Sequence, residues 1–143
     1  MRTATLGVVL AIAITASCGT PQKTDTRKPD EITALWTQIR DWRLEAGLPV
    51  EPRREDVMAI YNTPMKSAEP VCAADHSVPP TCTDVCGLAD AICDNAEQIC
   101  ILADDLKDQW SADKCASAKA SCREAKQRCC KKCSEEPKAP EPT

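Results

Sequence analysis

The cysteines are the residues of this sequence whose type and spacing could do chemistry. The chain has 143 residues and 11 cysteines, and all but one of these lie between positions 72 and 133. Thiols at this density suit structural disulfides, binding of a soft metal ion such as Cu(I), or thiol–disulfide exchange. Two stretches, CGLADAICDNAEQIC and CASAKASCREAKQRC, place a cysteine at every seventh residue. Whether the cysteines of one stretch can pair with those of the other decides between the three chemistries.

The two stretches match each other as the halves of an antiparallel helical hairpin. Residues that face each other in such a hairpin have position numbers with a constant sum, and four pairs of cysteines share the sum 215. A seven-residue spacing keeps these cysteines on the seam, the line along which the two helices meet. The sequence therefore predicts a ladder of interhelical disulfides, consisting of Cys82–Cys133, Cys86–Cys129, Cys93–Cys122 and Cys100–Cys115.

The residues beside the seam predict two unlike sides of the hairpin. Three positions after the seam cysteines the chain has small residues, which allow the close approach that disulfides demand; they are Ala89, Ala96, Ala103, Ala118 and Ala125. Four positions after the seam cysteines the residues are charged, and the register predicts ion pairs of Asp90 with Lys126 and of Glu97 with Lys119. The alanine side, where Ile92 also emerges, must be covered by another element.

Two further cysteines, Cys72 and Cys130, are predicted to pair, which would tie the segment before the hairpin to the end of its second helix. Gly87, close to Cys130 in the same register, is expected to leave room for this bond. Three cysteines crowd the end of that helix, so Cys72 bonded to Cys129 or Cys133 is the alternative.

Binding of Cu(I) is the main rival to the disulfide interpretation. The pairs Cys82/Cys86 and Cys129/Cys133 have i, i+4 spacing, so each could chelate one copper ion through thiolates. The seven-residue spacing elsewhere prevents chelation within one helix, and the chain has only 3 methionines. We favour disulfides and expect no cofactor, with copper bound by these four cysteines as the alternative.

Other functional classes find less support in the sequence. Cys130 and Cys133 have the C-x-x-C spacing of redox pairs, but both are expected in structural bridges. The chain has a single histidine, His76, and neither a Ser/His/Asp motif nor a nucleotide-binding motif. A net charge of −4 argues against nucleic acid as a partner. We expect neither an enzyme nor a site for a small-molecule substrate.

The N-terminus is typical of an exported lipoprotein. Residues 1–17 have a basic Arg2, a short apolar run and small residues at the end, as in a signal peptide. The following Thr-Ala-Ser-Cys-Gly resembles a bacterial lipobox, in which Cys18 would carry acyl chains such as palmitate and become the first mature residue. The alternative is an ordinary secretory signal that is cleaved near Cys18. Removing Cys18 from the 11 leaves an even number of cysteines, which can all pair in an oxidising compartment. The residue directly after Cys18 is Gly19 and not an aspartate, which resembles lipoproteins that are passed on to the outer membrane.

Between the two ends the chain predicts one small all-α domain. We expect the helical hairpin to pack against one or two N-terminal helices, the first of which presents a stripe of Ile32, Leu35, Trp36, Ile39, Trp42 and Ala46. The predicted organisation is a signal peptide (1–17), a flexible tether (18–29), a disulfide-stapled domain (30–133, with the hairpin at 82–133) and a disordered tail (134–143).

The helices of this domain have predicted limits. The first is expected to have Asp30 as its N-cap and to end at Gly47, and the second should place Val57, Met58, Ile60 and Tyr61 on its inner side. The proline-rich segment 62–80 is expected to be extended. The hairpin helices are expected at 82–107 and at 112–132, the second capped by Ser111.

The lipobox-like N-terminus, the stretch WTQIRDWRLEAGLP (residues 36–49) and the heptad block together resemble a group of cysteine-rich lipoproteins of myxobacteria. The hairpin is similar in architecture to disulfide-stapled helical hairpins such as the twin-cysteine CHCH proteins. Neither resemblance implies an activity. The sequence therefore predicts a structural or protein-interaction module of the bacterial cell envelope, anchored in the outer membrane through Cys18 and facing the periplasm or the cell surface, with another envelope protein as its partner.

Overall fold

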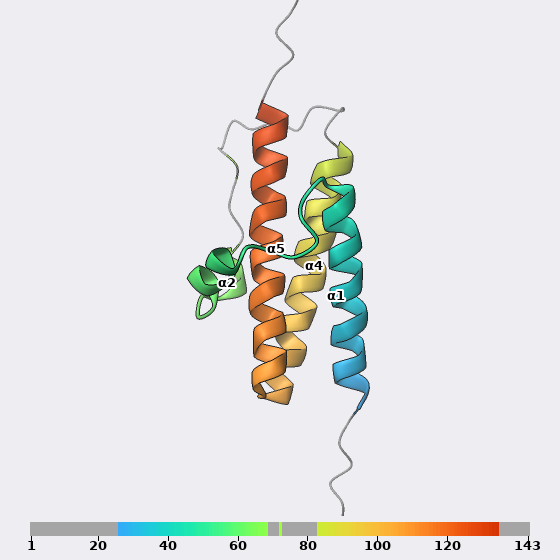
Figure 1. The fold of residues 1–143 in the computed structure, drawn as a ribbon, viewed down its shortest axis with the longest axis vertical. Helices are drawn as coiled ribbons and strands as arrows, with labels where there is room; N and C mark the ends of the chain where they lie inside the picture. The colour runs from blue at the N-terminus through green and yellow to red at the C-terminus, as the bar shows by residue number, and fades with distance from the viewer. Residues whose placement is uncertain (1–25, 69–71, 73–82, 135–143) are drawn as a thin grey trace, which may run out of the picture.

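The computed structural model describes residues 26–68, 72 and 83–134 of the chain. These residues form five helices, and no strand occurs among them (Figure 1). The helices are α1 (Arg27–Glu45), α2 (Arg54–Ile60), α3 (Met65–Ala68), α4 (Thr83–Leu106) and α5 (Gln109–Ser134). The prediction of an all-α fold built on an antiparallel hairpin is confirmed, with α4 and α5 as the hairpin.

A short turn joins α4 to α5. Lys107 adopts a left-handed conformation with φ of 56°, which reverses the chain at once. The backbone N–H of Ser111 donates to the side-chain Oδ1 of Asp108 at 2.8 Å, so Asp108 caps α5. The prediction that Ser111 caps a helix starting at residue 112 was therefore wrong, because Asp108 offers a carboxylate cap earlier in the chain.

Helix α1 is longer at its start than the sequence predicted. It begins at Arg27, so residues 27–29, expected in the tether, are helical. Pro29 is compatible with this because a proline in the first turn of a helix removes no intrahelical hydrogen bond. The end of α1 agrees better with the prediction: Gly47 has a φ of +72°, and the N–H of Leu48 donates to the carbonyl of Arg43 at 2.8 Å.

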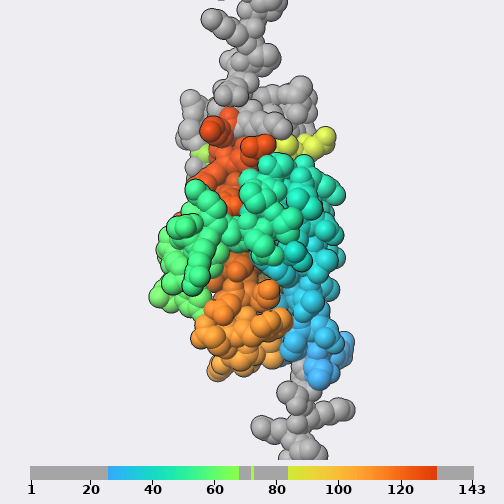
Figure 2. All heavy atoms as spheres, in the orientation of Figure 1, coloured from blue at the N-terminus to red at the C-terminus, as the bar shows by residue number. Residues whose placement is uncertain are grey.

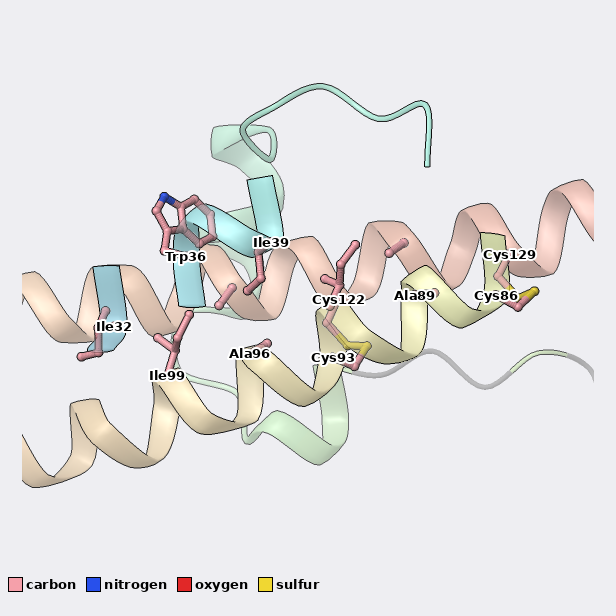
Figure 3. Close-up of a cluster of buried hydrophobic side chains, with 13 residues drawn as sticks. Ile32, Trp36, Ile39, Cys86, Ala89, Cys93, Ala96, Ile99, Cys122 and Cys129 are labelled. Atoms are coloured by element: carbon pink, nitrogen blue, oxygen red, sulfur yellow. A yellow bond between two sulfur atoms is a disulfide. The ribbon is translucent and has the colours of Figure 1, made fainter. Parts of the chain in front are cut away.

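Helix α1 covers the alanine side of the hairpin. Ile32, Trp36 and Ile39 are buried against α4 and α5 (Figure 3), and Leu35 and Trp42 are partly buried beside them. From the hairpin the core receives isoleucines together with small residues, namely Ala89, Ile92, Ala96, Ile99, Ala118 and Ala125. The predictions that the alanine side of the hairpin is buried and that the first helix covers it are both confirmed.

Helices α2 and α3 pack against α5, and α2 lies to one side of α5 while α1 lies to the other (Figure 1). Ile60 of α2 is buried against Ala120 of α5. Met58, which we expected on the inner side, is 64 % exposed. The segment after α2 is also not fully extended, since Met65–Ala68 form one helical turn that begins after Pro64.

Several predictions concern residues outside those that the structure describes. They include the signal peptide, Cys18, most of the tether, His76, the bond Cys82–Cys133 and the tail beyond residue 134. Ser134, expected to start the tail, is the last residue of α5.

Candidate functional site

The disulfides on the seam of the hairpin are the most distinctive feature of this protein. Between described residues, three disulfides join α4 to α5, with Cα–Cα distances of 4.9 Å for Cys86–Cys129, 4.6 Å for Cys93–Cys122 and 4.6 Å for Cys100–Cys115. Each lies where the common sum of 215 places it. Figure 3 shows two of these bonds, beside the small residues that allow the helices to approach.

A fourth disulfide joins Cys72 to Cys130 of α5 across a Cα–Cα distance of 5.4 Å. The pairing of Cys72 with Cys129 is not found, because Cys129 is bonded to Cys86. Gly87 does not have the role expected of it: a Cβ at this position would meet no atom within 4 Å, so this glycine is not what makes room for the bond.

Cysteines that are joined in disulfides have no free thiol, so these residues can act neither as nucleophiles nor as thiolate ligands of a metal ion. Cys86 and Cys129, two of the four candidates for copper, are consumed in a single bond. Among the residues that the structure describes, no group of three or more His, Cys, Asp or Glu side chains is arranged to hold a metal ion.

The disulfides differ in how far they are exposed. Cys93 is 4 % exposed and Cys122 is fully buried, so the central bond is closed to solvent. Cys100 and Cys115, near the α4–α5 turn, are half-buried. A hollow of about 350 Å³ beside this bond is also lined by Met65 and Lys119. A reductant in solution therefore reaches the bond near the turn more easily than the central one.

The charged side of the hairpin carries one of the two predicted ion pairs. Lys126 of α5 pairs with Asp90 of α4, as expected. Lys119 does not pair with Glu97: its Nζ donates to the carbonyl of Tyr61 at 2.9 Å and to that of Thr63 at 2.7 Å. The segment between α2 and α3 thus covers Lys119, which is 5 % exposed, and this burial lowers the pKa of its amino group.

A polar network lies between Tyr61 and the start of α5. The Tyr61 hydroxyl donates to Asp113 at 3.0 Å, and the side chain of Gln109 donates to both. The hydrogen bond to Asp113 favours the protonated phenol and raises the pKa of Tyr61. This network borders an open hollow of about 650 Å³, and it holds the end of α2 against α5.

A buried ion pair between α1 and α5 was not predicted from the sequence. Nη2 of Arg43 lies 2.7 Å from Oε2 of Glu124, and the Arg43 side chain is fully buried. Nε of Arg43 also donates to the carbonyl of Pro49 at 2.8 Å. A signal for this pair was present, because Arg43 follows Ile39 by four residues and so continues the apolar stripe of α1.

Comparisons with protein-family models, with curated proteins and with solved structures find no match for this chain. The resemblance to myxobacterial lipoproteins therefore stays a prediction. Among the residues that the structure describes, no helix combines the length and the apolar character needed to cross a lipid bilayer.

Proposed function

We propose that this protein is a rigid structural or protein-interaction module of the bacterial cell envelope, held at a membrane by lipidated Cys18. The observation that carries the proposal is the ladder. Disulfides of this number persist in oxidising compartments such as the periplasm and the cell surface, and they are rare in the cytosol. The lipobox-like sequence supplies the means of attachment in such a compartment.

The arrangement of the helices supports an orientation for the anchored domain. Helix α1 starts at the end of the bundle that holds the α4–α5 turn (Figure 1), and Lys28 pairs with Asp105 there at 3.1 Å. A tether from Cys18 would join the domain at this end. The opposite end, with Cys72–Cys130, would then point away from the membrane and be free to meet a partner protein.

Phase separation in a mild detergent and mass spectrometry test the anchor. The wild-type protein is expected in the detergent phase, with an N-terminal mass that includes acyl chains on Cys18. The Cys18→Ala variant is the control, and it should move to the aqueous phase. Recovery of wild-type protein without acyl chains would contradict the anchor and leave the stapled domain as a soluble module.

The intact mass also separates this proposal from copper storage. Ten cysteines remain when Cys18 is set aside, so complete pairing removes ten hydrogen atoms. A reduced polypeptide that carries copper would support storage of Cu(I) by Cys82, Cys86, Cys129 and Cys133 instead.

Crosslinking in intact cells, with the Cys18→Ala variant as the control, would identify an envelope partner.

A further inference from the structure

A hollow of about 260 Å³ lies between the segment that follows α1 and the C-terminal half of α5. Figure 2 shows these two parts in contact, the segment in teal and α5 in red. One wall is apolar and is formed by Leu48 and Pro49; the other is basic and includes Arg128 and Lys131. Neither the ladder nor the membrane anchor accounts for this combination.

Arg128 is held in place without a counter-charge. Its Nε is buried and has no hydrogen-bond partner among the residues that the structure describes. Its guanidinium lies over Gly47, so closely that a Cβ added to that glycine would be 2.9 Å from Nη2 of Arg128. A guanidinium in this position offers planar donors that suit the oxygens of a carboxylate or a phosphate.

Two carboxylates in the described part of the chain, those of Glu124 and Asp56, are already engaged. Glu124, which lines the hollow, binds Arg43 through Oε2 at 2.7 Å and accepts the backbone N–H of Arg53 through Oε1 at 3.2 Å. Asp56 binds the side chain of Arg53 at 2.7 Å. Within the described part of the chain, neither Arg128 nor Lys131 has an ion-pair partner. The basic wall therefore keeps an uncompensated positive charge.

We infer that this hollow binds a small oxyanion, a phosphate monoester or a carboxylate, that carries a short apolar group. The oxyanion would accept hydrogen bonds from Arg128 and lie near the ammonium of Lys131, and the apolar group would pack on Leu48 and Pro49. The volume of the hollow is enough for such a ligand but not for a large cofactor. The inference is independent of the membrane anchor, since every residue that carries it belongs to the folded domain.

Titration of the purified protein in an uncharged detergent tests the inference. It is followed by the NMR signal of the Arg128 Nε–H group and, in wild type and every variant alike, by that of the backbone N–H of Leu48, which lines the hollow. The probes are butyl phosphate and butyrate, with butanol as the uncharged control. We expect a saturable shift with at least one of the anions and none with butanol. Dihexanoyl phosphatidate, a soluble phospholipid, distinguishes the source: tighter binding than butyl phosphate indicates a lipid headgroup, and equal binding indicates a free phosphate ester.

Two variants and a matched control make the test specific. Arg128→Gln and Lys131→Gln should each weaken binding by about tenfold or more, because each removes one charged donor. Lys131 is exposed, so its replacement does not threaten the fold. Arg54→Gln removes the same charge from an exposed position on α2 outside the hollow and should leave the affinity unchanged. The inference is overturned if no anion gives a saturable shift, or if Arg54→Gln weakens binding as much as Arg128→Gln does.

Discussion

Arg43 of α1 and Glu124 of α5 form an ion pair of 2.7 Å in which the arginine side chain is fully buried. Glu124 is also the acceptor for the backbone N–H of Arg53, at the start of α2. One carboxylate thus holds α1, α2 and α5 together. Because both charged groups are largely removed from water, each depends on the other for its stability in the folded state.

Replacing Glu124 by glutamine is expected to lower the free energy of unfolding by about 3 kcal/mol, because it leaves the Arg43 cation buried without a counter-charge. Glu97→Gln removes the same charge from an exposed position on α4 and should change the free energy by less than about 0.5 kcal/mol. Urea unfolding followed by circular dichroism measures both. Equal effects of the two substitutions would contradict a stabilising role of the buried pair.

Complete reduction of the disulfides is expected to unfold the domain. A single disulfide that closes a 15-residue loop, the separation of Cys100 and Cys115, contributes about 3 kcal/mol in the loop-entropy model. The nested bonds add less than this each, but the small alanine and cysteine side chains of the hairpin bury little apolar area to replace them. Thermal melts followed by circular dichroism, with and without reductant, measure the effect. A reduced protein that keeps its helical signal and its melting temperature would refute this prediction.

Under limiting reductant, Cys100–Cys115 should open before Cys93–Cys122. Both residues of the first pair are half-buried, whereas Cys93 is 4 % exposed and Cys122 is 0 % exposed. Thiolate attack requires access to a sulfur atom. Rapid alkylation followed by peptide mass spectrometry gives the order. Opening of the central bond first, in protein that is still folded, would show that exposure does not control the order.

Two glycines are expected to respond to alanine in opposite directions. Gly87→Ala should stabilise the protein by about 0.5 to 1 kcal/mol, because Gly87 lies within α4 and its Cβ would meet open space. Gly47→Ala should destabilise it by about 1 kcal/mol or more, because φ is +72° there, a backbone conformation that residues with a Cβ rarely adopt. Thermal melts of the two variants form a matched pair. The prediction fails if both substitutions shift the melting temperature in the same direction.

The stability of the protein should depend on pH through Lys119. Burial lowers the pKa of this amino group from its ordinary value of 10.5. Between the lowered pKa and 10.5, the unfolded chain binds a proton that the folded protein does not, so the free energy of unfolding should rise as the pH rises through this window. This gain in the free energy of unfolding is complete above pH 10.5, where Lys119 is neutral in both states, and it is absent below the lowered pKa, where Lys119 is charged in both states.

Lys119→Gln should remove this pH dependence, and Lys66→Gln on the exposed surface of α3 is the control. Urea unfolding at a series of alkaline pH values gives the difference between wild type and each variant. NMR titration of the Lys119 side chain provides a direct check, and a pKa at or above 10.5 would contradict the prediction.

The register of the hairpin and its apolar side follow from local rules that a sequence displays. Seven-residue spacing decides which residues share a helix face, and a disulfide tolerates only a narrow range of Cα–Cα distances. The positions of Cys93 and Cys122 therefore predict which residues lie on each side of the seam, including Ala96 and Ala125 on the side that α1 covers. The stripe of α1 was equally visible, because its apolar residues recur with the helical period.

Only the tertiary structure decided what covers the charged side of the hairpin and which charges are buried there. Lys119 was expected to meet Glu97, but α2 and the residues after it lie over Lys119 and provide backbone carbonyls instead. The fate of Arg43 and Glu124, 81 residues apart, was equally open in the sequence. Such contacts depend on the path of an irregular connecting segment, whose side chains follow no period. That path is set by the packing of all the helices together, so it emerges only when they are assembled.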